Sequence, residues 1–116
     1  MQKEFDIHKR VFSFVVRVLH LIRFLPKDLV HKTISEQLIR SSTSIGANDQ
    51  EANGVNSKKD FIHCYTIVRK ELLETSYWLS LIAEMNPGLK ARMNQLISEN
   101  QELVKITSTI IKNAKV

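Results

Sequence analysis

The sequence predicts an all-α protein that folds as an antiparallel up-down-up-down four-helix bundle, with residues 1–116 forming a single domain. Three observations predict this class. The chain contains only 3 Gly and 2 Pro, its apolar residues recur at helical spacing, and short breaks interrupt it near residues 26, 54–57 and 86–88. The breaks leave helical segments of about 5–25, 27–53, 58–86 and 88–114, joined by turns so short that successive helices must be antiparallel neighbours.

The first segment, residues 5–25, ends before Pro26 because proline lacks a backbone donor and clashes with the preceding turn. Its apolar side chains cover roughly 180° of the helix at 100° per residue, whereas a core-facing stripe needs little more than about 100°. Phe12, Val16 and Phe24 belong to this excess. They predict an interface with another copy of the chain. The alternative is a broad core helix with a few exposed apolar residues, which is common.

The second segment, residues 27–53, contains the stretch IRSSTSIGANDQEA at 39–52, which is rich in weak helix formers. Its small side chains predict a close approach to the third helix, where large rings are available in Tyr65, Tyr77 and Trp78. The expected core line of this helix is Ile34, Leu38, Ser41, Ile45, Asn48 and Ala52. Close packing with satisfied polar groups is the structural interpretation, and a ligand site at the same place is the alternative.

A polar cluster is expected where the second and third helices cross. Glu71 and Glu74 share one face of the third helix, and Arg40 faces them from the second. We expect a structural cluster that sets the helix register and comprises Arg40, Ser41, Ser44, Asn48, Glu71 and Glu74. Acid–base catalysis by the paired carboxylates is the less favoured alternative.

The third segment, residues 58–86, is expected to start with a capping box between Ser57 and Asp60. The fourth, residues 88–114, is expected to use Asn86 as its N-cap and Pro87 as its first helical residue. Apolar residues then repeat every seven positions at Leu89, Leu96, Leu103 and Ile110. A seven-residue repeat is typical of helices that pack with a left-handed supercoil.

The net charge of +5 is concentrated on the first and last segments. Residues 1–27 hold six basic and two acidic side chains, a net of +4, and residues 87–116 hold five and two, a net of +3. We expect these cations to lie along one side of the bundle as a phosphate-binding surface: Arg10, Arg17, Arg23, Lys27, Lys90, Arg92, Lys105, Lys112 and Lys115. A solvated face that serves solubility is the alternative. No sequence-specific reading motif is present.

Known enzyme sites in helical bundles require particular residues at particular spacings. No Glu is followed by His three positions later, so a di-iron bundle site is not expected. The single cysteine, Cys64, excludes a disulfide framework and a cysteine zinc site, and suits the cytoplasm. The apolar run at 11–25 is interrupted by Arg17, His20 and Arg23 and is too short to span a membrane. We therefore expect no catalytic residue, no metal, no cofactor and no membrane partner.

Several blocks together resemble a known family. They are RSSTSIGAN at 40–48, Glu51-Ala52, Ser57, Asp60-Phe61 and KELLETSYWL at 70–79. The chain resembles, over nearly its whole length, the four-helix-bundle family of 23S rRNA intervening-sequence proteins. The resemblance implies a small bacterial protein whose relatives form homopentamers and have no established enzymatic activity. Those relatives include an accessory protein of diversity-generating retroelements, which is a basic barrel that binds nucleic acid and a reverse transcriptase.

Residues and resemblance together predict a non-enzymatic bundle that assembles into a ring, expected to be a homopentamer. Its basic surface is expected to engage RNA or DNA, or a nucleoprotein partner such as a reverse transcriptase. Two alternatives stay open. One is a structural adaptor for a protein partner without nucleic-acid binding, and the other is an enzyme built around Glu71 and Glu74.

Overall fold

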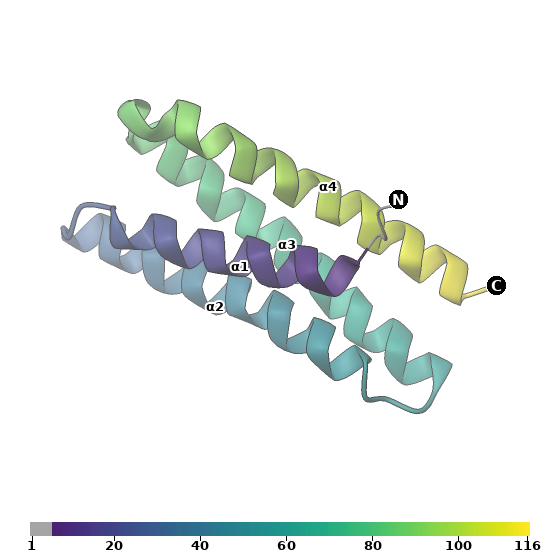
Figure 1. Ribbon diagram of the computed structural model, residues 1–116. Helices are drawn as coiled ribbons and strands as arrows, with labels where there is room; N and C mark the ends of the chain where they lie inside the picture. Colours follow the sequence, from purple (N-terminus) through teal and green to yellow (C-terminus); the bar gives the residue numbers. More distant parts are fainter. Residues whose placement is uncertain (1–5) are drawn as a thin grey trace.

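The computed structural model describes residues 6–116, which contain four α-helices, one short 3₁₀ turn and no β-strand. The elements are α1 (Ile7–Arg23), α2 (Leu29–Ala52), α3 (Lys58–Met85), η1 (Pro87–Leu89) and α4 (Lys90–Ala114). Figure 1 shows successive helices running in alternate directions along one bundle. The predicted fold class, an up-down-up-down four-helix bundle, is therefore confirmed. The predicted start of the first helix at residue 5 lies outside the described residues.

The helix starts are set by side chains that accept backbone N–H bonds. Asp6 caps α1 by accepting from the N–H groups of His8 and Lys9. Asp28 caps α2, so this helix begins two residues later than the sequence indicated. The Ser57 side chain accepts from the N–H of Asp60 at 3.1 Å, as expected for this cap. Each cap satisfies donors that the first helical turn leaves unpaired.

The start of the fourth helix differs from the prediction. Asn86 makes no side-chain cap, and Pro87–Leu89 form a 3₁₀ turn before α4 begins at Lys90. The Asn86 amide is used elsewhere, because its Nδ2 donates to the Ile82 carbonyl and to Nε2 of His31, both at 2.9 Å. Asn86 thus lies at the C-terminal end of α3 and hydrogen-bonds to the first turn of α2, instead of capping the N-terminus of α4.

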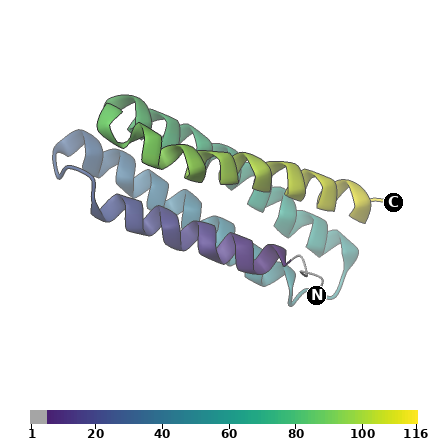
Figure 2. The same ribbon diagram turned by 45° about the horizontal axis from the view of Figure 1, so that its top comes forward.

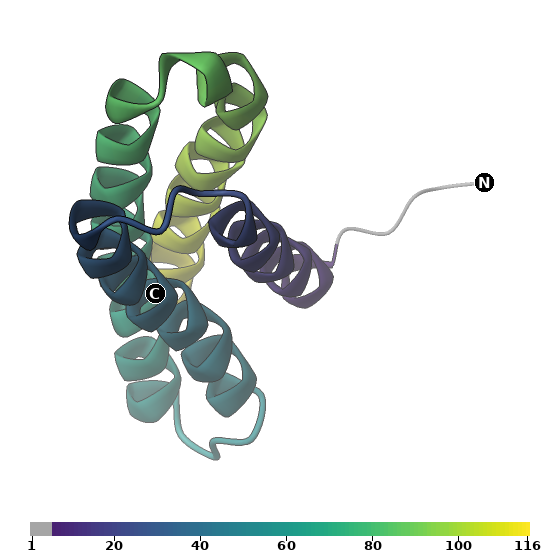
Figure 3. The same ribbon diagram turned by 90° about the vertical axis from the view of Figure 1, so that its left-hand side faces the viewer.

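The four helices do not contact one another equally. The α2–α3 pair has the most extensive contact, α3–α4 comes next, and α1 packs on α2 while touching α4 only lightly. Figure 2 shows α1 and α4 in front of α2 and α3, and Figure 3 shows that α1 is inclined to α4. The core between the helices contains Phe14, Leu38, Tyr65, Leu72, Leu79 and Leu103. The light α1–α4 contact leaves a groove between these two helices.

The small residues of α2 pack against two different neighbouring helices. Ser41 is fully buried, and its Oγ lies 2.8 Å from Oγ1 of Thr75 on α3. Gly46, in contrast, faces α1, because a Cβ added there would lie 3.6 Å from Cγ2 of Val15. The expected close approach at Gly46 to the rings of the third helix is therefore wrong. The small side chain admits α1 instead.

A buried carboxylate joins three helices at the other end of this stretch. Asp49 is 1% exposed and accepts a hydrogen bond of 2.6 Å from the Tyr65 hydroxyl on α3. His8 Nδ1 on α1 lies 3.0 Å from both Asp49 oxygens. The predicted core line placed Asn48 here, and this was wrong, since the inward face advances four residues from Ile45 to Asp49. Asn48 is half-buried instead.

Removing the Tyr65 hydroxyl is expected to destabilise the fold. Tyr65→Phe leaves the buried Asp49 carboxylate with one donor fewer, which typically costs roughly 1–3 kcal/mol of unfolding free energy. Urea denaturation near neutral pH measures this loss. A variant as stable as the wild type would show that the hydroxyl–carboxylate bond contributes nothing.

The same variant tests a pH dependence. Burial, together with the Asp49 carboxylate, raises the pKa of Tyr65 above its ordinary value, which is about 10. The folded state thus keeps the phenol neutral while the unfolded chain releases the proton, so this contribution is complete below about pH 10 and declines above it. Between about pH 9 and pH 11, the wild type should lose more stability than Tyr65→Phe. Equal losses would contradict the assignment.

Candidate nucleic-acid interface

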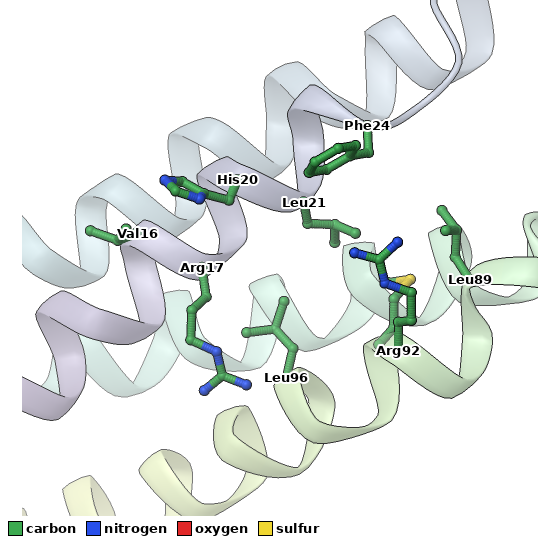
Figure 4. Close-up of a pocket in the computed structure, with 9 residues that line it drawn as sticks. Val16, Arg17, His20, Leu21, Phe24, Leu89, Arg92 and Leu96 are labelled. Atoms are coloured by element: carbon green, nitrogen blue, oxygen red, sulfur yellow. The ribbon is translucent and has the colours of Figure 1, made fainter.

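A groove of about 430 Å³ lies between α1 and α4, where these helices touch only lightly (Figure 4). Its floor is apolar, because Leu21 of α1 meets Met93 and Leu96 of α4 there. The lining residues recur at three- and four-residue steps on both helices, so each helix turns one face toward the groove. They are Val16, Arg17, His20, Leu21, Phe24, Leu89, Arg92, Met93 and Leu96.

Two arginines line this groove, one from each helix. Arg17 extends from α1 toward α4, and Arg92 extends from α4 toward Phe24 (Figure 4). The guanidinium carbon of Arg92 lies 5.7 Å from the centre of the Phe24 ring, within the range of a cation–π contact. Both arginines are exposed, and none of the described residues that line the groove is acidic. The arrangement can attract an anion and shelter an apolar or flat group beside it.

The remaining basic residues of the predicted surface lie outside this groove. Arg10 is half-buried and binds Glu99 through Nε and Nη2 at 3.0 and 2.6 Å, which raises the pKa of the guanidinium. Lys90 pairs with Glu84 at 3.2 Å. Only Arg17 and Arg92 of the predicted set share the α1–α4 groove. Arg23, Lys27, Lys105 and Lys112 are exposed outside it.

A second cationic groove lies between α3 and α4, on another face. It contains Lys115 of the predicted set together with Arg69 and Lys70, which the sequence analysis did not select. Arg69 is held in place because its Nε donates to Oγ of Ser108 at 2.7 Å. Positive charge therefore occurs on two faces of the bundle.

The three residues predicted as an oligomer interface fall in two places. Val16 and Phe24 line the α1–α4 groove. Phe12 is 69% exposed and lines a separate groove of about 290 Å³ between α1 and α2, next to His8 and Gly46. Further large apolar side chains are exposed on α2 and α3, including Leu29, Val30, Ile39, Leu73 and Tyr77.

The predicted polar cluster forms around Arg40. Its Nη1 lies 3.4 Å from Glu71, its Nη2 contacts Glu74, and the Trp78 indole donates to Glu74 at 3.0 Å. Ser41 is adjacent through Thr75. Both carboxylates are therefore held by α2–α3 contacts, and Glu71 is 7% exposed.

Two members of the expected polar cluster lie elsewhere on α2. The Asn48 amide donates to the Ser44 carbonyl at 2.9 Å and to the Ser44 hydroxyl at 3.2 Å. These bonds stay within one helix, so Ser44 and Asn48 do not join Arg40. The reason is distance along the helix, since at 1.5 Å per residue these positions lie about 6 and 12 Å beyond Arg40 on a similar side of α2.

Within residues 6–116, no group of three or more His, Cys, Asp or Glu side chains is placed to hold a metal ion. Cys64 is buried, and its burial raises the thiol pKa, which disfavours the reactive thiolate. No helix in the described part of the chain combines the length and the apolar character that crossing a membrane requires.

Polar residues not predicted as functional or structural include the buried Asp49 with its half-buried partner His8, and the buried Asn100. Asn100 is fully buried on α4, and within the described part of the chain neither polar atom of its side chain has a hydrogen-bond partner. Its position was visible in the sequence, because it lies four residues after Leu96 and three before Leu103 on the predicted apolar stripe.

Comparisons with known proteins agree with the architecture. The model of the 23S rRNA-intervening sequence protein family matches residues 3–109. A crystal structure from Bacteroides thetaiotaomicron, described as a protein with unknown function from the S23 ribosomal protein family, is 34% identical and superimposes with a TM-score of 0.84. The similarity covers 92% of this chain and 99% of that one. A comparison with curated proteins found no match. The chain therefore belongs to the family of 23S rRNA-intervening sequence proteins.

Proposed function

We propose that this protein is a non-enzymatic nucleic-acid-binding bundle that assembles into a homo-oligomeric ring, with five copies as the expected number. The observation that carries the proposal is the α1–α4 groove, which Arg17 and Arg92 line from opposite helices without a carboxylate among the lining residues. Phosphate groups are among the ligands that exposed guanidinium groups bind well. The same surface is available to the nucleic acid of a nucleoprotein partner.

The overall charge supports this proposal. A single chain carries +5, and a ring multiplies that charge at a fixed spacing, which raises the local attraction for a polyanion. Binding of this kind releases counterions from the nucleic acid and therefore weakens steeply with salt. No element within residues 6–116 has the form of a sequence-reading module, so the proposed binding is not sequence-specific.

Self-association is supported by exposed apolar side chains on several helices. Phe12 on α1 and Leu29 on α2 are both largely exposed, as is Tyr77 on α3. A ring needs two different complementary surfaces on each subunit, because each copy contacts its two neighbours through opposite sides. Apolar residues on both α1 and α2–α3 meet that requirement.

A protein adaptor is the second candidate function. The observation that favours it is the adjacent exposed pair Leu29 and Val30 at the start of α2, which is suited to a protein partner as well as to a second copy. Catalysis by Glu71 and Glu74 is not proposed, because Arg40 and Trp78 already occupy these carboxylates.

The proposal is tested by titrating the wild-type protein against fluorescent RNA and DNA of unrelated sequences. Binding is expected at about 50 mM salt, with log affinity falling linearly with log salt by about 0.9 per neutralised phosphate on duplex DNA. Little difference between sequences is expected. If the wild type binds no nucleic acid at this ionic strength, the proposed nucleic-acid binding is wrong and the protein adaptor is the remaining candidate function.

A further inference from the structure

We propose that the α1–α4 groove selects single-stranded over double-stranded nucleic acid by stacking a base on Phe24 while Arg17 and Arg92 hold the neighbouring phosphates. This inference rests on the proposed nucleic-acid binding and specifies its substrate class. It combines three features of one groove: an exposed aromatic ring, a cation beside that ring and a second cation further along α1.

The Phe24 ring is unusually available for a residue of its size. It follows the last turn of α1, where it is the C-cap, and is 68% exposed although it borders an apolar floor. Arg92 approaches the ring to 5.7 Å. A base stacked on this ring gains both the aromatic contact and the nearby positive charge.

The spacing of the groups matches a short length of nucleic-acid strand. Arg17 and Phe24 are seven residues apart on α1, which is about 10 Å along a helix at 1.5 Å per residue. A stacked strand rises 3.4 Å per nucleotide, so this distance corresponds to roughly three nucleotides. The groove, at about 430 Å³, therefore accepts a short stretch of strand and its exposed bases.

Duplex nucleic acid cannot use the aromatic part of this site. In a duplex the base faces are covered by their neighbours in the stack, and only phosphates reach a protein surface without distortion. A duplex would therefore contact Arg17 and Arg92 but leave Phe24 uncovered. The expected preference for single strands comes from the ring, and the charge dependence comes from the arginines.

An acidic amphipathic peptide is the competing occupant. It would match the two arginines and the apolar floor formed by Leu21 and Met93. The exposed ring of Phe24, with the guanidinium carbon of Arg92 over it at 5.7 Å from its centre, is matched better by a nucleobase, because a planar base stacks on an aromatic ring and attracts a nearby guanidinium. With this assignment Phe24 is a nucleic-acid-binding residue, and Phe12 stays in the predicted oligomer interface.

The test compares two phenylalanines of equal exposure on one helix. Fluorescence anisotropy at about 50 mM salt would use a labelled oligothymidylate of about 12 nucleotides and a hairpin duplex with the same number of phosphates. Phe24→Leu keeps the apolar volume but removes the ring. It should weaken single-strand binding about 5- to 150-fold, the usual value of one base–aromatic stack, and leave duplex binding unchanged. The matched control, Phe12→Leu, should change neither.

A positive signal comes from Phe24→Trp. This variant should bind the single strand at least as tightly as the wild type, and addition of the strand should quench the new indole emission, with Phe12→Trp as the unquenched control. Circular dichroism and light scattering of each variant check the fold and the assembly.

Each other outcome overturns the inference. If Phe24→Leu weakens the binding of neither the oligothymidylate nor the hairpin duplex, or weakens both equally, the ring does not select single strands, although nucleic-acid binding remains. If Phe24→Leu reduces the assembled mass, Phe24 belongs to a subunit contact. If the wild type binds an acidic amphipathic peptide but neither nucleic acid, both this inference and the proposed function fail.

Discussion

Reversing both groove arginines, by combining Arg17→Glu with Arg92→Glu, is expected to remove most nucleic-acid affinity. The double change replaces two cations that line one groove with two carboxylates that repel phosphate. The slope of log affinity against log salt should become shallower by about 1.8, which is two phosphates at about 0.9 each on duplex DNA. Electrophoretic mobility shift or anisotropy measured between about 50 and 200 mM salt gives this slope.

The matched control reverses two exposed lysines at the start of α3. Lys58→Glu with Lys59→Glu lowers the net charge from +5 to +1, as the arginine pair does. Neither lysine lines the α1–α4 groove. If both double variants lose affinity equally, binding depends on total charge alone and the groove has no special part in it.

Replacing Phe12 with glutamate is expected to dissociate the assembly. Phe12 is 69% exposed in the single chain, and in a subunit contact a carboxylate at its position would be buried without a partner, which is strongly unfavourable. Multi-angle light scattering should report a mass several times 13.4 kDa for the wild type and about 13.4 kDa for Phe12→Glu.

The neighbouring Ser13 supplies the control for this change. Ser13 is also exposed on α1, so Ser13→Glu introduces the same charge one position away and should preserve the assembled mass. A wild-type chain that is monomeric at micromolar concentration would contradict the ring, and a Phe12→Glu variant of unchanged mass would place the subunit contact elsewhere.

The fold could be predicted because its signals are local. Pro26 and the Ser57 cap act on the few residues around them, so helix ends were located to within about two residues. The 3₁₀ turn at Pro87 was missed because Asn86 bonds to His31, 55 residues away. A cap and a tertiary hydrogen bond use the same amide, and only the fold decides between them.

The buried face of α2 shows the limit of periodicity. Asn48 and Asp49 are both polar, and a core line can advance by either three or four residues from Ile45. The choice depends on donors from other helices, since Tyr65 and His8 make Asp49 the residue that is stable when buried. Nothing near position 49 in the sequence indicates those partners.

The candidate groove was predicted in its chemistry but not in its geometry. Arg17, Arg92 and Phe24 were each selected from the sequence, the arginines as phosphate ligands and Phe24 as an interface residue. Whether these three residues line the same groove depends on the angle between α1 and α4, which the apolar pattern does not determine. The pairing of Arg10 with Glu99 across those helices is invisible in the sequence for the same reason.

The Asp49 carboxylate, shared by α1, α2 and α3, has a consequence for how this chain can change during evolution. Losing Tyr65 or His8 alone leaves a buried charge short of a donor, whereas exchanging all three residues for apolar ones of similar shape is close to neutral. Positions 8, 49 and 65 are thus coupled, and substitutions accepted at one depend on the residues present at the other two. The order in which such substitutions arise is constrained, because the intermediates are less stable than either end point.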